Sequence, residues 1–231
     1  MSDHDFVSFF SASYSEARQK FLTECNSRSL AIESRLNPHA KGANDEDLFT
    51  DIVRIGRPDT TKALLLISGT HGVEGYCGSG AQVGLLRQSS FDDLPSDMSV
   101  IMIHALNPYG FSHDRRVNED NIDLNRNFID FAQSGRPEGD YSKIHEHILP
   151  ADWDGPAREA ANLGLLDYIQ QHGMDAFQAA ISSGQYRYPD GLFYGGKGPS
   201  WSNKMLRSVV AEYLRGVKAL GVIDFLSLIH I

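Results

Sequence analysis

The apolar residues of this chain occur in two patterns, short runs and helically spaced positions. Residues 63–68 and 99–105 are mainly apolar runs, which are typical of strands buried on both faces of a sheet. Residues 8–34 instead carry apolar side chains three and four positions apart, which predicts a helix that ends at Asn37-Pro38. The two patterns together predict a protein in which helices and strands alternate.

The remaining elements follow from the same patterns and from turn residues. Residues 186–200 contain several glycines and two prolines, which predicts a long loop. Residues 221–225 form a short apolar run that predicts another buried strand. A further strand is expected at 51–55, and helices are expected through 82–88 and over 158–183 and 201–217.

A strand, a helix and a second strand follow one another between residues 63 and 105. This order and spacing indicate a parallel βαβ unit. Ligands in open α/β sheets bind beyond the carboxyl ends of the strands, and His71 and Asn107 come just after the two strand ends. No repeat or low-complexity linker interrupts the chain, so we expect a single domain over residues 1–231.

Composition and charge argue against nucleic acid and membranes as partners of this protein. The formal net charge of −9 argues against nucleic acid, because phosphate binding needs clustered Lys and Arg. The longest apolar stretch, residues 63–67, is too short to span a bilayer, and the acidic N-terminus does not resemble a signal peptide. The two cysteines, Cys25 and Cys77, cannot make a disulfide framework. We therefore expect a cytoplasmic protein with reduced thiols and no membrane partner.

The first candidate for chemistry is the H-x-x-E sequence His71-Gly72-Val73-Glu74, directly after a predicted strand. Residues three apart in a helical turn face the same side, so an imidazole and a carboxylate can converge on one cation. Catalytic zinc takes such ligands, in sets of three with a water. On this pair alone, a turn histidine with a solvent-exposed glutamate is the favoured interpretation.

The second candidate lies after the next predicted strand. Residues 116–118 read Arg-Val-Asn, and residues 123–128 read Asp-Leu-Asn-Arg-Asn-Phe. Arginine offers a planar fork of donors suited to a carboxylate or an oxyanion, and asparagine adds a neutral amide that can orient it. Without His71, this segment would be interpreted as a polar loop with surface ion pairs.

Together these elements resemble the M14 zinc carboxypeptidase superfamily, closest to the bacterial M14-like family DUF2817. The matching segments are Thr-His-Gly-Val-Glu-Gly at 70–75, Asn-Pro-Tyr-Gly-Phe at 107–111, Arg-Val-Asn at 116–118 and Asp-Leu-Asn-Arg-Asn-Phe at 123–128, in the family's order. The clear motifs lie between positions 65 and 130. The resemblance implies a three-layer α/β fold with a mixed, mainly parallel sheet flanked by helices.

Carried over by position, the resemblance implies a role for each residue. His71 and Glu74 would be zinc ligands, and Arg116 would polarise the scissile carbonyl and stabilise the oxyanion. Asn125 and Arg126 would hold the terminal carboxylate of a peptide or peptide-like substrate. The implied reaction is zinc-assisted hydrolysis that removes a C-terminal residue. The second enzyme hypothesis is a zinc amidohydrolase of the aspartoacylase or succinylglutamate desuccinylase type. Such enzymes share these elements and act on N-acyl amino acids.

The pattern breaks near the last residues. The family's third ligand is a histidine that would fall at position 226, after the strand at 221–225, but this position is Leu226. The family's later general-base glutamate has no counterpart. We therefore expect a truncated domain whose residues 226–231 are a non-native tail, and a fragment with little or no activity. A module that binds carboxylates without turnover, through Arg116, Asn125 and Arg126, is the alternative from a different class.

Overall fold

The computed structural model describes residues 4–133 and 139–226. The chain divides into two compact units, one of residues 1–119 with 201–231 and one of residues 120–200. The single domain expected over residues 1–231 therefore stays a prediction. Leu226 is described, but the remainder of the expected non-native tail, 227–231, lies outside the described residues.

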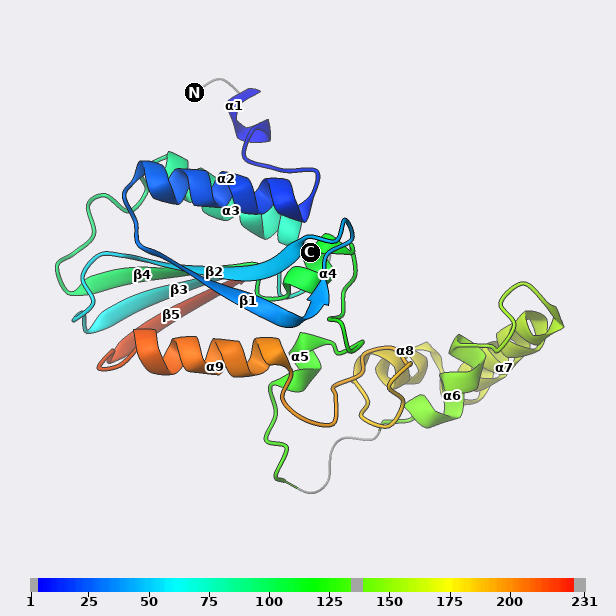
Figure 1. Ribbon diagram of the computed structural model, residues 1–231. Helices are drawn as coiled ribbons and strands as arrows, with labels where there is room; N and C mark the ends of the chain where they lie inside the picture. Colours follow the sequence, from blue (N-terminus) through cyan, green and yellow to red (C-terminus); the bar gives the residue numbers. More distant parts are fainter. Residues whose placement is uncertain (1–3, 134–138, 227–231) are drawn as a thin grey trace. The chain divides into compact units, whose positions relative to one another are not determined.

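The first unit is built on a mixed five-stranded sheet in the order β1-β2-β4-β3-β5 (Figure 1). Strand β2 pairs antiparallel with both β1 and β4, whereas β3 pairs in parallel with β4 and with β5. The mixed sheet and the parallel βαβ unit are thus confirmed. The strands are β1 (Ile32–Lys41), β2 (Asp47–Ile55), β3 (Lys62–Ser68), β4 (Met98–His104) and β5 (Ala219–Phe225).

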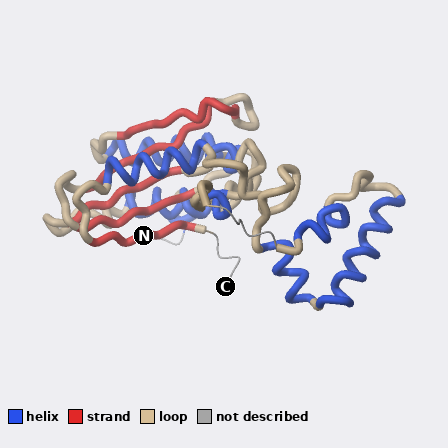
Figure 2. The backbone as a smooth tube through the Cα atoms, turned by 90° about the horizontal axis from the view of Figure 1, so that it is seen from below, coloured by secondary structure: helices blue, strands red, loops and turns tan. Residues whose placement is uncertain are grey.

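Helices cover both faces of this sheet and complete a three-layer unit (Figures 1 and 2). Helices α2 and α3 lie on one face, where Phe21, Leu66, Val83 and Met102 are part of a buried core. Helix α9 lies on the other face, and Arg54 of β2 donates to the Tyr213 carbonyl at 2.7 Å. The helices of this unit are α1 (His4–Val7), α2 (Tyr14–Ser27), α3 (Gly75–Arg87), α4 (Pro108–Ser112) and α9 (Trp201–Tyr213).

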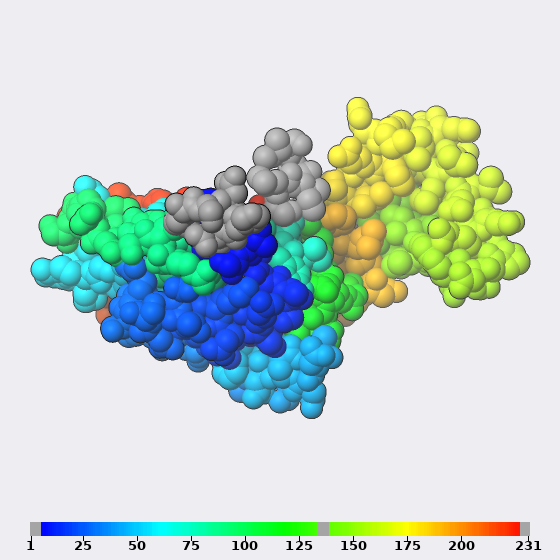
Figure 3. Space-filling model, turned by 90° about the horizontal axis from the view of Figure 1, so that it is seen from above, coloured from blue at the N-terminus to red at the C-terminus, as the bar shows by residue number. Residues whose placement is uncertain are grey.

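Helix α2 lies at the surface of this unit (Figure 3). Helix α2, in blue, lies next to the green segment that joins α3 to β4. Arg28, just after α2, donates to the Leu86 carbonyl and to Ser89 Oγ. At the other end Ser13 caps the helix by accepting from the Glu16 amide. The Ser13 cap and these hydrogen bonds hold α2 in place over the core.

Some predicted elements of the first unit were wrong in part. The helix predicted over 8–34 ends at Ser27, and β1 begins at Ile32. Pro38 is compatible with β1 because this strand lies at an edge of the sheet and its register shifts between Leu36 and Lys41. The predicted strand at 221–225 exists, but it is not buried: Val222 is 54% exposed, since β5 is the other edge strand among those described.

The second unit is helical and carries the long loop. Helices α6 (Tyr141–Ile148), α7 (Pro156–His172) and α8 (Met174–Ser182) pack around Ile144, Tyr168 and Ala180. The helix predicted over 158–183 is broken at Gly173, whose φ is +86°.

The predicted loop over 186–200 is confirmed and is ordered by one side chain. Asn127, in the short helix α5 (Leu124–Asn127), donates to the carbonyls of Gly195 and Gly198 and accepts from the Ser200 amide. One buried amide thereby fixes the glycine-rich end of the loop.

In the part of the chain that the structure describes, none of the helices is long and apolar enough to cross a membrane.

The core of the first unit contains a buried histidine that determines how stability responds to acid. His104 stacks on Phe21, and its Nε2 lies 2.9 Å from Ser79 Oγ, while Nδ1 has no partner among the described residues. Burial lowers the pKa of His104 from 6.5 to about 4, although the Asp51 carboxylate opposes this and Arg18 adds to it. The folded protein therefore holds His104 neutral under conditions in which the unfolded chain is protonated.

We expect the free energy of unfolding to fall as the pH drops from 6.5 towards 4. The lowered pKa means that the unfolded state binds the extra proton, with a loss of about 3 kcal/mol for this one group by pH 4. Urea unfolding of wild type and His104→Gln over this range measures the histidine's share. The variant should show a shallower fall, and an unchanged pH dependence would contradict the assignment.

Candidate metal centre

The candidate centre lies at the carboxyl end of β3. After Ser68 the chain turns through Gly69, whose φ is +68°, and reaches His71 before α3 begins at Gly75. The segment after β4 runs beside this turn, because the Leu106 and Asn107 amides donate to the carbonyls of Ser68 and Gly69 at 2.9 and 2.8 Å. The two strand ends are therefore joined by backbone hydrogen bonds, as expected for neighbouring parallel strands.

Gly72 brings the loop after α4 against the H-x-x-E segment. Its amide donates to the Arg115 carbonyl at 3.0 Å. A Cβ at position 72 would lie 1.9 Å from the backbone carbon and oxygen of Gly110, so only glycine fits without movement of the backbone. Asn107 stabilises the same turn, accepting from the Gly110 amide at 2.9 Å. The half-buried Arg116 thus directly follows a residue bonded to the H-x-x-E segment.

His71 and Glu74 converge. His71 Nδ1 lies 3.0 Å from Glu74 Oε2, and the exposed fractions of the two side chains are 4% and 12%. This is the distance of a hydrogen bond or ion pair, and it is close to the separation of about 3.4 Å expected of two zinc ligands with bonds of about 2.1 Å and a tetrahedral angle. The interpretation favoured for the H-x-x-E pair taken alone, a solvent-exposed glutamate, is wrong, because a turn of the chain buries both side chains. The metal-ligand roles that the resemblance implies stay a prediction.

The pair fits part of a zinc site. Among the described residues no group of three His, Cys, Asp or Glu side chains has metal-ligand spacing. Strand β5 pairs in parallel with β3, with Phe225 beside Ser68, so Leu226 is the first residue beyond the same edge of the sheet. Position 226, where the resemblance implies a third ligand, therefore comes directly after the strand that lies beside β3. This position carries an aliphatic side chain.

A carboxylate that sequence reasoning did not single out reaches this loop. Asp224 of β5 accepts from the Thr70 hydroxyl, which lies 2.9 Å from both carboxylate oxygens. Burial raises the pKa of Asp224, and the Thr70 hydrogen bond and His71 partly offset this increase. The available signal was an acidic residue inside an otherwise apolar strand.

The remaining predicted site residues belong to the second unit and are described within it. Asn125 is exposed, and its backbone amide donates to the Asp123 carboxylate at 2.9 Å. Arg126 is half-buried, and its Nη2 donates to the Ser182 carbonyl at 2.6 Å. Its Nη1 also donates to the Asn125 carbonyl at 3.4 Å, so two nitrogens of the guanidinium are held by backbone carbonyls. The implied binding of a substrate carboxylate by Asn125 and Arg126 stays a prediction.

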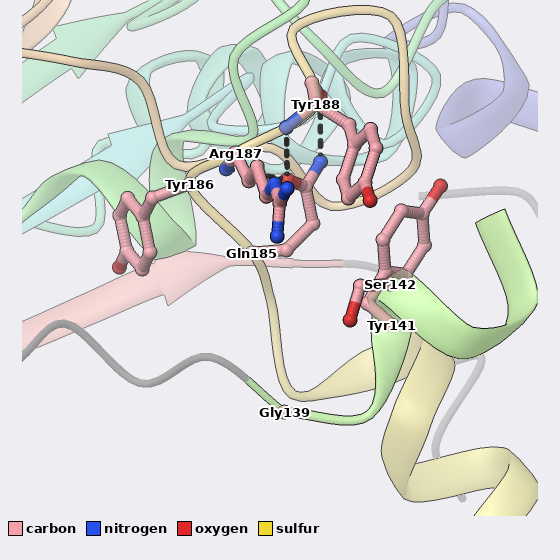
Figure 4. Close-up of a pocket in the computed structure, with 7 residues that line it drawn as sticks. All are labelled: Gly139, Tyr141, Ser142, Gln185, Tyr186, Arg187 and Tyr188. Atoms are coloured by element: carbon pink, nitrogen blue, oxygen red, sulfur yellow. Dashed lines mark hydrogen bonds between the residues drawn. The ribbon is translucent and has the colours of Figure 1, made fainter.

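The second unit also has a small cavity, between the start of α6 and the long loop (Figure 4). Its volume is about 10 Å³, which is room for about one water molecule. The buried Gln185 amide oxygen accepts from the amides of Arg187 and Tyr188, as the dashed lines show. The loop around the cavity is thus held by hydrogen bonds, and the cavity is too small for a peptide.

Comparison with known proteins identifies the family. The model of the family "Protein of unknown function (DUF2817)" matches residues 10–228. The chain belongs to the DUF2817 family. No curated protein matches it.

Solved structures show which fold this DUF2817 chain has. It is similar to bovine thrombin-activatable fibrinolysis inhibitor in complex with tick carboxypeptidase inhibitor, at 14% identity and a TM-score of 0.51, over 92% of this chain and 60% of that one. It is also similar to carboxypeptidase A from Helicoverpa armigera, at 13% identity and a TM-score of 0.52, over 93% and 45% of the two chains. The carboxypeptidase-like α/β fold is confirmed, and the chain spans less than two thirds of the length of either protein.

We expect Gly72→Ala to disrupt the candidate centre. The added methyl group would collide with the Gly110 backbone, and over-packing against backbone costs about 3 kcal/mol. Gly198→Ala is the matched control, because a Cβ there has nothing within 4 Å. Urea unfolding of the two variants should show a large loss of stability for the first and little change for the second. Equal stabilities would mean that the loop does not depend on this close approach.

Proposed function

We propose that this DUF2817 chain carries the metal-binding half of a zinc-dependent hydrolase of the metallocarboxypeptidase kind. The observation that supports this most is the 3.0 Å approach of His71 Nδ1 and Glu74 Oε2 at the carboxyl end of β3. The carboxypeptidase-like fold supports the same function, because ligands of such sheets bind beyond the carboxyl ends of the strands. His71 and Glu74 would hold the zinc, which acts as a Lewis acid when it is bound.

Arg116 is the proposed stabiliser of negative charge on the carbonyl oxygen under attack. Its main chain is held beside the H-x-x-E segment, since the preceding carbonyl accepts from Gly72 and its own carbonyl lies 3.5 Å from Asn107 Nδ2. A guanidinium held beside the carbonyl oxygen would stabilise developing charge without reorganisation. We assign Arg116 this role because its backbone position is set by the same turn that carries the metal pair.

Asn125 and Arg126 are the proposed partners of the substrate's terminal carboxylate. Arg126 donates one N–H from Nη2 to the Ser182 carbonyl and one from Nη1 to the Asn125 carbonyl. Each of these nitrogens carries a second N–H that can donate to a carboxylate. The substrate class is a peptide or peptide-like molecule with a free C-terminal carboxylate. With Leu226 at the proposed third ligand position, we propose that the chain has little or no turnover by itself.

Placing histidine at position 226 tests this proposal. We expect Leu226→His to bind Zn²⁺ at least about tenfold more tightly than wild type, because a third ligand adds 1.4 kcal/mol or more. Isothermal titration calorimetry measures the affinity, and Leu226→Ser controls for loss of the aliphatic side chain.

The same titration distinguishes the outcomes. Adding His71→Ala to Leu226→His should remove the gain, because both residues act on one ion. If Leu226→His binds Zn²⁺ no more tightly than Leu226→Ser, the proposed centre is wrong. Binding of an N-acylated dipeptide that is unaffected by chelators and by His71→Ala would instead favour a carboxylate-binding module.

A further inference from the structure

Outside the His71–Glu74 pair, one side-chain contact joins the candidate centre to a different strand. The Thr70 hydroxyl, from the residue directly before His71, reaches both oxygens of Asp224 at 2.9 Å. Asp224 pairs with Ile67 in the β3–β5 register, so its carboxylate extends past the end of β3 to meet the loop. Two segments more than 150 residues apart are joined there by one hydroxyl.

This carboxylate has few partners for a half-buried group. A carboxylate has about four acceptor positions, yet Thr70 is the one side chain hydrogen-bonded to it among the described residues. No arginine or lysine forms an ion pair with it in the described part of the chain. Buried charges are normally paired or bound to a cation. Asp224 therefore lies in an environment that favours a positive charge nearby.

The groups near Asp224 connect it to the proposed ligands His71 and Glu74. Asp224 interacts electrostatically with both His71 and Glu74. The cluster thus contains two carboxylates and one imidazole on the edge formed by β3 and β5. Carboxylates and an imidazole are the side-chain types that surround divalent cations in proteins. Asp224 itself is not at ligand spacing in a group of three, so its contribution acts on the ligands and on the field at the site.

We propose that Asp224 and Thr70 are positioning residues of the cation site, which hold the His71 loop on β5 and supply negative charge behind it. This inference rests on the proposed function, because it requires His71 and Glu74 to bind the ion. Residues that orient metal ligands in this way usually change metal affinity 10- to 100-fold when they are substituted. A purely structural contact would instead change stability and leave the affinity of the folded protein unchanged.

Four variants separate positioning from stability. Thr70→Val removes the hydroxyl at almost constant shape, Thr70→Ser retains it, and Asp224→Asn keeps an acceptor for Thr70 while removing the charge. Thr60→Val is the matched control, because Thr60 is also buried and its Oγ1 bonds to Ser99 Oγ at 2.8 Å, just before the opposite end of β3. The measurements are Zn²⁺ affinity by calorimetry, the visible absorption of Co²⁺ bound at the same site, and thermal unfolding without metal.

We expect Thr70→Val and Asp224→Asn to bind Zn²⁺ about tenfold more weakly than wild type and to change the Co²⁺ spectrum. Thr70→Ser and Thr60→Val should bind within about twofold of wild type. Asp224→Asn should unfold at nearly the wild-type temperature, which shows that the fold is intact.

Two results would overturn the inference, and they can be told apart. If Asp224→Asn and Thr70→Val bind Zn²⁺ like wild type, while His71→Ala binds far more weakly, the positioning role is wrong and the proposed function stands. If His71→Ala binds Zn²⁺ as well as wild type does, the proposed metal centre fails and the inference fails with it.

Discussion

The close backbone approach of Gly72 to Gly110 and Arg115 is the constraint on which the rest of the candidate site depends. Only a residue without Cβ allows this approach, and the Gly72 amide bonds to the Arg115 carbonyl. The turn that orients His71 and Glu74 is thereby fixed to the loop that carries Arg116. Main-chain geometry thus brings the backbone of Arg116 close to the His71–Glu74 pair, although the two segments lie far apart in the sequence.

In the first unit, a buried carboxylate of the sheet is paired with an arginine of a covering helix. Asp51 of β2 is fully buried, and Arg18 of α2 binds it through two nitrogens while stacking on Phe49. A bidentate guanidinium is the partner that a buried carboxylate needs, since an unpaired charge in the core would be costly. Asp224 contrasts with this arrangement, because it lies at the edge proposed to bind the cation and has, among the described residues, one hydroxyl as its side-chain hydrogen-bond partner. The difference between these two carboxylates is the physical basis for assigning structural roles to one and functional roles to the other.

The sequence predicts the parts of the fold that depend on local pattern. The apolar runs of β3 and β4 are unambiguous because both faces of these strands are covered. The H-x-x-E spacing allows His71 and Glu74 to converge, but only the family resemblance led us to expect the 3.0 Å approach that the structure shows. Strand β1 was missed because an edge strand with a polar face has no continuous apolar run, and its register shift accommodates Pro38. The exposure of β5 could not be read from its apolar residues, since burial depends on which strands lie beside it. The Thr70–Asp224 contact depends on the β3–β5 register, a long-range pairing that local patterns do not specify.

The central claim is that His71 and Glu74 bind a divalent cation together, and X-ray absorption at the zinc edge tests it most directly. With one equivalent of Zn²⁺, the account predicts one imidazole in the first coordination shell, with oxygen ligands at about 2.0–2.2 Å. His71→Ala should remove the imidazole signal. His113→Ala should leave it unchanged, because His113 Nε2 lies 3.1 Å from the Lys41 carbonyl and is not a proposed ligand. An imidazole contribution that persists in His71→Ala would contradict the account.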